Sequence, residues 1–328
     1  MDDANTMRSS TAQREGLAGS GFGFDQSIPP GGYRWWYVDG FSACGLFGVT
    51  VIAFIGSVFS PYYFRARRNG TGIATEHVSL NVILYGPTKA RWCMTERGSS
   101  SLHQSSECLN IGPSAVRATS EGLLIDVAER ATPLGQRVSG QIKLGFATPL
   151  PDCFELDTSG EHWWWPIAPL ATIDVRMDCP NLSWNGLGYF DSNYGARPLE
   201  TGFASWNWCR GHVAGGGCQI HYDTQLAGGG ERCLSLEIQP TGKTKRLSSP
   251  DLGYLPKGPI WRVARPARLP PSSRRSVKTL EDTPFYTRSH IRSDQGDFMH
   301  ESLDMNRFCR TWVQCLLPFR MPRMARNA

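Results

Sequence analysis

The ten cysteines of this 328-residue chain include no Cys-x-x-Cys pair and no cysteine–histidine spacing typical of a zinc site. We therefore expect no metal. Residues 1–23 lack the basic segment followed by an apolar one that marks an export signal. We expect a cytoplasmic protein whose cysteines are reduced and mostly buried.

No glycine-rich stretch has the context of a nucleotide-binding loop. Residues 19–23 are rich in glycine, but no strand pattern precedes them and two prolines follow where a helix would begin. The glycine triplets at 215–217 and 228–230 flank a strand pattern around Ile220. We expect these triplets in hairpin turns, where glycine adopts positive φ without strain.

No segment has the composition of a membrane-spanning helix. Residues 41–64 are almost free of charge, but glycine, serine and proline interrupt them. Within this run, the β-branched stretch 49–55 predicts a buried strand, and 56–64 predicts an apolar, aromatic loop. The loop either covers the core or faces lipid.

Positive charge is concentrated in one stretch towards the C-terminus. An anionic membrane surface would attract this stretch, but its composition also fits a loop that is simply exposed to solvent. No recognition-helix pattern accompanies it, so we do not expect nucleic acid as a partner. The basic residues of this stretch are Arg262, Arg265, Arg268, Arg274, Arg275 and Lys278.

Aromatic and turn-forming residues are abundant, with 11 Trp, 35 Gly and 22 Pro. This composition favours short strands around an apolar cavity, and no stretch shows a sustained helical period. We predict an all-β sandwich or barrel in two domains. Residues 305–317 fit either a short helix or a final strand. The clearest strand patterns are 78–85, 91–95, 123–127, 138–144, 172–177, 218–223 and 233–238.

Several motifs carry a resemblance to a known family. They are GYRWWYVD at 32–39, IAFIGSVFSPYY at 52–63, MTERG at 94–98, HWWWPIAP at 162–169, GYFDSNYG at 188–195 and MHESL at 299–303. On these motifs, which extend over roughly 29–323, the chain resembles the carotenoid 1,2-hydratases, also called hydroxyneurosporene synthases.

The resemblance implies two lipocalin-like β domains with few short helices, at residues 29–170 and 171–323. Residues 1–28 lie outside it, and their polar, glycine-rich composition predicts a flexible tail. The implied activity is that of a hydro-lyase that needs no cofactor and hydrates the terminal C1–C2 double bond of an acyclic carotenoid such as neurosporene or lycopene.

By motif, the resemblance assigns catalytic roles to His162, Trp164, Tyr189 and Asp191. Hydrating an isolated alkene without a metal requires protonation of carbon, followed by capture of the tertiary carbocation by water. A carboxyl group in an apolar site can hold the necessary proton, and we expect Asp191 to deliver it. The rings of Trp164 and Tyr189 would stabilise the cation. His162 would hold the water, accept its proton or orient Asp191.

Further aromatic residues are expected to contact the substrate, namely Trp36, Phe59, Tyr62, Trp165 and Tyr194. Asp39 and Glu96 are expected in supporting roles. Because so long a hydrocarbon does not diffuse freely in water, we expect the protein to associate peripherally with the cytoplasmic face of the inner membrane. The sequence gives no indication of oligomeric state.

Other interpretations of the same residues stay open. The tryptophans 163–165 also fit a hydrophobic core, His162 a structural histidine, and Asp191 the start of an Asx turn. The whole chain also fits a lipocalin-like carrier of a carotenoid or another lipid, or an acid-assisted terpenoid cyclase or isomerase. Glu155 and Asp157 fit a glycosidase pair only weakly, because residues two apart on one strand face lie about 6–7 Å apart, which matches neither the retaining nor the inverting mechanism.

Overall fold

The chain folds into two compact units, seen in a computed structural model that describes residues 7, 9–10, 21–88 and 90–324. Unit 1 comprises Met1–Arg8, Leu156–Gly160 and Leu199–Gln314, and unit 2 comprises Ser9–Glu155, Glu161–Pro198 and Cys315–Ala328. The expected domain boundary after residue 170 falls inside a strand of unit 2. Most of the expected tail, 1–28, lies outside the described residues, while Phe22 and Phe24 near its end are buried in the core of unit 2.

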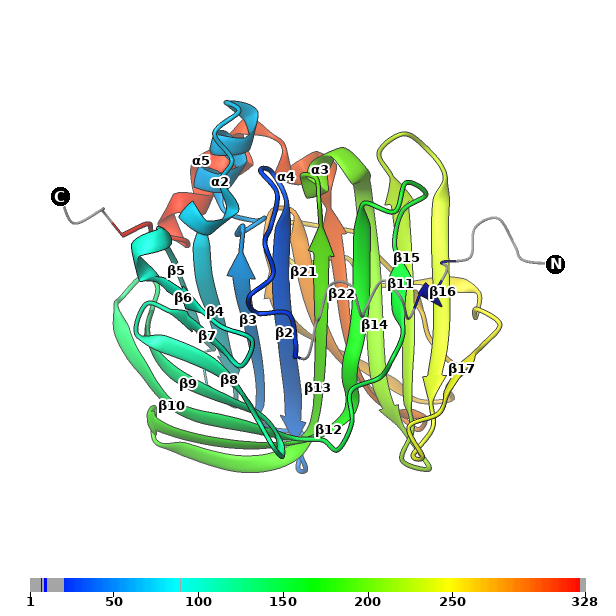
Figure 1. The fold of residues 1–328 in the computed structure, drawn as a ribbon. Coiled ribbons are helices and arrows are strands. Elements are labelled where there is room, and N and C mark those ends of the chain that lie inside the picture. Colours follow the sequence, from blue (N-terminus) through cyan, green and yellow to red (C-terminus); the bar gives the residue numbers. More distant parts are fainter. Residues whose placement is uncertain (1–6, 8, 11–20, 89, 325–328) are drawn as a thin grey trace. The chain divides into compact units, whose positions relative to one another are not determined.

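Unit 2 is built on one large antiparallel sheet. Its strand order is β5-β4-β3-β2-β13-β12-β10-β9-β8-β7-β6, and β11 pairs with β1 and β12 (Figure 1). The strands are β1 (Ser9–Ser10), β2 (Tyr33–Ser42), β3 (Gly48–Ile55), β4 (Val78–Tyr85), β5 (Arg91–Arg97), β6 (Leu102–Gln104), β7 (Cys108–Ile111), β8 (Ser114–Thr119), β9 (Gly122–Ala131), β10 (Gln136–Gly145), β11 (Cys153–Glu155), β12 (His162–Cys179) and β13 (Leu182–Gly195).

The sheet curls so that β5 contacts β9, although six strands lie between β5 and β9 in the sheet order. The Thr132 backbone N–H, just past β9, donates a hydrogen bond to the Trp92 carbonyl on β5 at 3.0 Å. Val82, Ile125 and Val175, from three well-separated strands, belong to one hydrophobic cluster. The concave side of the curl therefore holds the main core of unit 2.

The central strands have a second buried face. Every residue of β2, β3 and β4 is buried, whereas β9 alternates between buried and half-buried positions. Successive side chains of a strand point to opposite faces, so half of the residues of β2–β4 face away from the concave core. That second face carries the polar residues described below.

The few helices of unit 2 are short. The aromatic segment predicted as a loop at 56–64 is helical from its sixth residue, because α2 covers Pro61–Arg68. The Ser60 hydroxyl accepts hydrogen bonds from the backbone N–H groups of Tyr62 and Tyr63, and Pro61 occupies the first turn, where its missing N–H is harmless. The loop prediction was therefore wrong for this part. The 3₁₀ turns are Ala74–Glu76, Ser99–Ser101 and Leu317–Phe319.

Unit 1 contains a seven-stranded antiparallel sheet in the order β17-β16-β15-β14-β22-β21-β20, and a separate β18-β19 pair. The glycine triplets lie in the β14–β15 and β15–β16 turns, as expected, with Gly215 and Gly229 at positive φ. Its strands are β14 (Phe203–Val213), β15 (Cys218–Leu226), β16 (Glu231–Ile238), β17 (Thr244–Arg246), β18 (Leu252–Leu255), β19 (Arg265–Arg268), β20 (Arg275–Asp282), β21 (Tyr286–Ser293) and β22 (Gly296–Asp304).

The remaining helices are α3 (Leu199–Gly202), α4 (Met305–Phe308) and α5 (Thr311–Leu316). The segment 305–317 is therefore helical, which decides between the two structures that the sequence left open. The prediction of an all-β fold with few short helices is confirmed. No helix among the described residues has both the length and the apolar character needed to cross a membrane.

Candidate active site

The β12–β13 hairpin places the predicted catalytic residues on one face of the sheet. His162 pairs with Gly195 and Trp164 with Asn193, and residues that pair directly share a face. Tyr189, Asp191 and Asn193 alternate along β13 and share that face as well. We call the side of the sheet that carries Asp191 the Asp191 face.

The Asp191 carboxyl group receives two hydrogen bonds at one oxygen atom. Trp164 Nε1 and Tyr189 OH both donate to Asp191 Oδ2, each at 2.8 Å. All three side chains are buried, with 4% of Asp191 exposed and none of Trp164 or Tyr189. Because Oδ2 accepts two bonds, a proton on the neutral acid belongs on Oδ1. The arrangement therefore fixes which oxygen can act as a proton donor.

His162 is held against β2. Its Nδ1 lies 2.9 Å from Tyr33 OH, and the two rings stack with centroids 5.8 Å apart. A Cβ atom at Gly195, directly opposite on β13, would lie 2.6 Å from His162 Nδ1. Glycine is therefore needed at residue 195 to leave room for the imidazole.

Aromatic rings continue along the Asp191 face. Tyr33 stacks on Trp35 at 5.0 Å, and Trp35 contacts Phe54 at 5.9 Å and Phe59 at 6.2 Å between ring centroids. Of the five residues expected to contact substrate, Phe59 is therefore the one that joins the aromatic group on this face. Its half-buried ring follows β3.

Three other expected substrate contacts lie on the opposite face. Trp36 and Trp165 belong to the concave core, where their indole N–H groups donate to the carbonyls of Phe22 and Leu150 at 2.9 and 2.8 Å. Tyr194 is three residues from Asp191, so it points to the other side of β13. Tyr62 lies on α2 beneath the guanidinium of Arg323, at 5.9 Å. The structure thus does not bring these four side chains to Asp191.

A buried arginine occupies the face behind the site. The Arg34 guanidinium lies 5.0 Å from the Tyr194 ring and 5.2 Å from the Trp36 ring, and it donates to the Phe22 carbonyl at 3.0 Å. Loss of hydration on burial lowers the pKa of Arg34 to about 10, and burial raises the pKa of Tyr194. Arg34 therefore stays charged at neutral pH.

Tyr33, Trp35 and Tyr37 are residues of the Asp191 face that the sequence did not single out. They alternate along β2, ending at Asp39, and this period-two pattern is visible in the sequence. Tyr37 OH donates to Asp39 Oδ2 at 2.7 Å. Glu96, the other supporting candidate, instead binds His77 and Arg323 at the end of β5. No cluster of His, Cys, Asp and Glu suited to a metal occurs in the part of the chain that the structure describes.

A curled antiparallel sheet whose buried face carries a carboxyl group bonded to phenol and indole donors defines a lipocalin-like β protein with an internal acid. The family described as "Carotenoid hydratase CrtC" matches residues 51–328. The chain belongs to this carotenoid hydratase family.

Curated relatives agree with the family match. The acyclic carotenoid 1,2-hydratase of Thiocapsa roseopersicina is 42% identical over 306 residues, covering 92% of this chain and 75% of that protein. The enzyme of the same name from Rubrivivax gelatinosus is 39% identical over 309 residues, covering 92% and 76%. That of Cereibacter sphaeroides is 35% identical over 280 residues, covering 83% and 98%.

Two solved structures share the fold. Kievitone hydratase from Nectria haematococca has a TM-score of 0.52 and 11% identity, covering 86% of this chain and 92% of that one. A protein described as "putative AttH" from Nitrosomonas europaea has a TM-score of 0.56 and 11% identity, covering 82% and 91%. At such low identity the similarity extends to the fold alone.

Proposed function

We propose that this protein is a cofactor-independent carotenoid 1,2-hydratase that adds water across the terminal C1–C2 double bond of an acyclic carotenoid such as neurosporene or lycopene. The observation that carries the proposal is the 42% identity to an acyclic carotenoid 1,2-hydratase over 92% of the chain. The buried Asp191 cluster supplies the acid that this reaction requires.

The reaction begins at Asp191 Oδ1. The proton on this oxygen moves to C2 of the substrate, the π electrons form the new C–H bond, and a tertiary cation develops at C1. Trp164 and Tyr189 hold Oδ2 at 2.8 Å each and stabilise the carboxylate that the proton leaves behind. Their buried rings also offer cation–π stabilisation to the cation at C1. Water then bonds to C1, and loss of one of its protons to a base yields the tertiary alcohol.

His162 acts in this proposal by holding the geometry around Trp164. Both residues project from β12 to the Asp191 face, and Tyr33 fixes the imidazole from β2 at 2.9 Å. In the alternative roles, the His162 imidazole holds the attacking water or accepts its proton, so a single variant tests all three. A His162→Gln variant in deuterated oxygen-18 water distinguishes them. A positioning role lowers deuterium uptake into recovered substrate and labelled alcohol together, whereas loss of the water-binding group or base lowers the alcohol alone.

The decisive test compares the purified protein with its Asp191→Asn variant on lycopene in detergent, in oxygen-18 water and without added cofactor. We expect the wild-type product to carry one labelled hydroxyl group, and the variant to lose about 100-fold or more of this activity, the usual contribution of a general acid. Asp174→Asn is the matched control, because Asp174 lies on the same hairpin but pairs with exposed Arg176.

Each other outcome points to a different function. An unlabelled, cyclised product would indicate an acid-assisted cyclase, and tight binding without turnover would indicate a carotenoid carrier. A fully active Asp191→Asn variant would contradict the assignment of the acid while leaving the hydratase activity intact.

We further propose that the protein takes its substrate from a membrane, to whose cytoplasmic face it attaches peripherally. A long acyclic hydrocarbon partitions into lipid, so its concentration in water is too low to supply an enzyme that is not attached to the membrane. The basic stretch 262–278 offers fewer free positive charges to a membrane than its composition indicates. Arg265 is buried, and Arg268 pairs with Asp223 at 2.7 Å.

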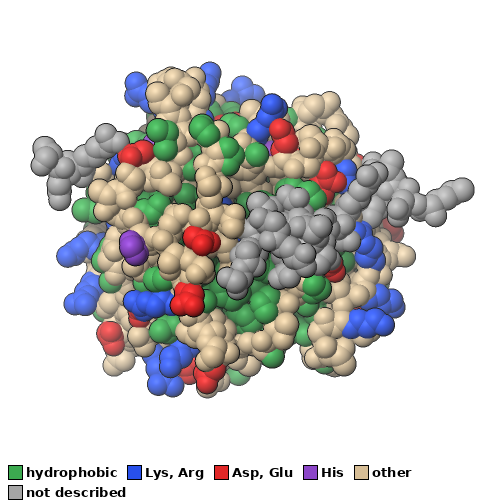
Figure 2. Space-filling model, in the orientation of Figure 1, with side chains coloured by type: hydrophobic (Ala, Val, Ile, Leu, Met, Phe, Trp, Pro, Cys, Tyr) green, Lys and Arg blue, Asp and Glu red, His purple; other side chains and the backbone are tan. Residues whose placement is uncertain are grey.

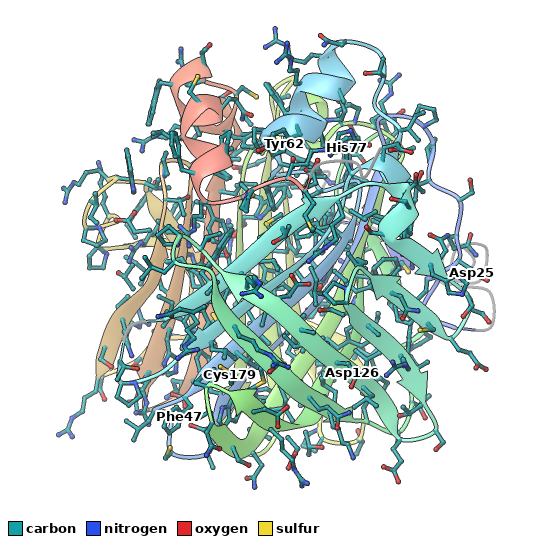
Figure 3. The ribbon with its side chains drawn as sticks, turned by 90° about the vertical axis from the view of Figure 1, so that its left-hand side faces the viewer. Asp25, Phe47, Tyr62, His77, Asp126 and Cys179 are labelled. Carbon is teal, nitrogen blue, oxygen red and sulfur yellow. The ribbon has the colours of Figure 1, made fainter. Side chains whose placement is uncertain are left out.

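An apolar surface on unit 2 fits lipid better. We call it the C-terminal apolar surface, and it consists of Leu316, Phe319 and Met324, with exposed fractions of 42%, 79% and 58%. Arg323, beside Met324, reaches the Tyr62 ring of α2, and α2 presents the exposed cations Arg65 and Arg68. Figure 3 shows Tyr62 and His77 at this end of the unit and Phe47 and Cys179 at the other.

Exposed apolar residues flanked by arginines suit an anionic bilayer, which takes up the rings and attracts the cations. The face drawn in Figure 2 carries hydrophobic, basic and acidic side chains, with hydrophobic ones gathered near its lower centre. We expect a Phe319→Ser and Leu316→Ser double variant to bind anionic vesicles about tenfold more weakly in a sedimentation assay, because two large side chains no longer enter the lipid.

The matched control is Leu134→Ser, since Leu134 has the same exposed fraction as Phe319, 79%, but lies in the β9–β10 turn. Equal loss of vesicle binding in the control and the double variant would contradict this choice of surface. No binding of the wild-type protein to vesicles would contradict membrane attachment itself.

A further inference from the structure

Two adjacent strands carry the same tyrosine–aspartate pattern on the Asp191 face. On β2, Tyr37 OH donates to Asp39 Oδ2 at 2.7 Å, and on β13, Tyr189 OH donates to Asp191 Oδ2 at 2.8 Å. The strands are antiparallel, so Tyr37 pairs with Asp191 and Asp39 pairs with Tyr189. Each tyrosine therefore lies opposite the carboxyl group of the other strand.

The two carboxyl groups are diagonal neighbours on one buried face. Diagonal positions of an antiparallel pair are separated by roughly 7–8 Å. Asp39 is fully buried and Asp191 is 4% exposed. The rings of Tyr37 and Tyr189 meet edge to face at 6.2 Å, between the two acids. Two carboxyl groups at this spacing can act on neighbouring atoms of one substrate from different positions.

A third strand adds an independent observation. Thr50 on β3 lies directly opposite Asp39, on the side away from β13. Its side chain is fully buried, and Thr50 Oγ1 has no hydrogen-bond partner among the described residues. Leaving a buried hydroxyl unsatisfied is unfavourable, and an ordered water molecule is a common partner for such a group. Directly opposite side chains, with Cβ atoms roughly 5 Å apart, can share one water.

Hydration of an alkene needs a group that binds water as well as an acid. Asp191 transfers its proton to C2, and the water that attacks C1 must lose a proton to a second group. A carboxylate that accepts a bond from Tyr37 and faces a threonine hydroxyl is suited to hold that water and to accept its proton.

We infer that Asp39 is the catalytic base of the hydration and that, with Thr50, it holds the attacking water molecule. The inference rests on the proposed hydratase function. Water oxygen bonds to C1 as one O–H bond breaks and its proton moves to the Asp39 carboxylate. Asp191 has meanwhile given one proton to C2, so a single proton returning from Asp39 to Asp191 restores the starting state.

The test separates protonation of carbon from capture by water. Wild-type protein and Asp39→Asn are incubated with lycopene in deuterated oxygen-18 water, and both the alcohol and the recovered substrate are examined by mass spectrometry. In the variant, Asp191 still delivers a deuteron to C2, and the uncaptured cation reverts to alkene. We expect the labelled alcohol to fall about 100-fold, the usual worth of a general base, while deuterium still enters the recovered lycopene.

A merely structural role for Asp39 gives a different result. Loss of folding or of Asp191 geometry lowers labelled alcohol and deuterium uptake in parallel, as Asp191→Asn itself does, and that result would overturn the inference. An unchanged yield of alcohol would overturn it as well. If wild-type protein forms no alcohol, the proposed function fails, which is distinct from either outcome.

Thr50→Val keeps the shape of the side chain and suits a strand, so it tests the same water site with little risk to folding. We expect the rate of alcohol formation to fall about tenfold with KM for lycopene unchanged, because the lost hydroxyl bonds water and not the hydrocarbon. Thr172→Val, at an exposed position of β12, is the control. Equal rates in the Thr50 and Thr172 variants would contradict a shared water site.

Discussion

At the scale of single residues, tyrosine hydroxyls supply hydrogen bonds to the buried carboxyl groups. Tyr189 donates to Asp191 and Tyr37 donates to Asp39, while Tyr33 bonds His162. A phenol is large enough to fill an apolar layer and still brings one hydrogen bond to a carboxyl group. The Asp191 face can therefore be polar at the reacting atoms and aromatic around them.

Tyr189→Phe isolates one of these bonds. Without the phenol, Asp191 Oδ2 keeps the Trp164 donor but loses the Tyr189 bond, so the carboxylate formed in the reaction is less stabilised. We expect kcat to fall about tenfold to 100-fold with KM little changed. Steady-state kinetics with lycopene measures both constants. Tyr254→Phe, whose ring is 75% exposed on β18, controls for loss of any hydroxyl, and equal kcat in the two variants would contradict the role of Tyr189.

Which residues gather at Asp191 follows only partly from the sequence. Trp164 and Tyr189 were predicted with Asp191, and the structure brings all three together. Trp165 was chosen with Trp164, although neighbours on a strand point to opposite faces. The contribution of Tyr37 depends on the β2–β13 register, which pairs residues about 150 positions apart in sequence. No local pattern encodes that register.

At the scale of elements, the end of the chain is joined to the edge strand of the large sheet. The Glu96 backbone on β5 bonds Pro322 and Met324, each at 3.0 Å. The Glu96 side chain, 1% exposed, accepts from Arg323 and lies 2.8 Å from His77 Nδ1. An edge strand offers unpaired backbone groups, so this segment both covers the edge and supplies a counter-charge.

Arg323→Ala therefore leaves a buried carboxyl group with one partner fewer. Breaking a buried ion pair from one side costs about 3 kcal/mol, and we expect the free energy of unfolding in urea to fall by about that amount. Arg68→Ala, an exposed cation in the last turn of α2, serves as the control and should change stability by less than about 0.5 kcal/mol. An Arg323 variant as stable as wild type would mean that the segment is not anchored by this pair.

The strands were more predictable than the helices. The strand predicted at 78–85 coincides with β4, and 172–177 lies inside the much longer β12, because alternating and β-branched patterns mark strand centres better than ends. Helix α2 went unrecognised because its eight residues are too few for a helical period to appear. Its capping serine and first-turn proline were the available signals.

At the scale of the whole molecule, both units bury titratable polar groups. Unit 2 buries carboxyl groups beside tyrosines, together with His162, on the Asp191 face, and unit 1 buries His221 and His300. His221 Nδ1 lies 2.9 Å from Ser235 Oγ on neighbouring strands, and His300 Nε2 donates to the Pro266 carbonyl at 2.8 Å. Both imidazoles are almost fully buried. The stability of unit 1 is therefore tied to the neutral form of these rings.

The pH dependence of stability follows from the two histidines. Burial, with nearby Arg268 or Arg265, lowers the pKa of each to about 4, from about 6.5 in an unfolded chain. Between these values the unfolded chain binds protons and the folded chain does not, so the free energy of unfolding falls as the pH drops from about 6.5 to 4. Each histidine contributes on the order of 3 kcal/mol to that fall.

Urea unfolding at pH 7, 6 and 5 measures this effect, and a His221→Gln, His300→Gln double variant should show a flatter pH dependence than wild type. His103→Gln, an exposed position in β6, should leave the pH dependence unchanged. The double variant removes two hydrogen bonds and will be less stable at pH 7, so the slope against pH carries the information. A slope equal to that of wild type would mean that carboxyl groups elsewhere govern acid unfolding, and that the two imidazoles bind protons equally in the folded and unfolded states.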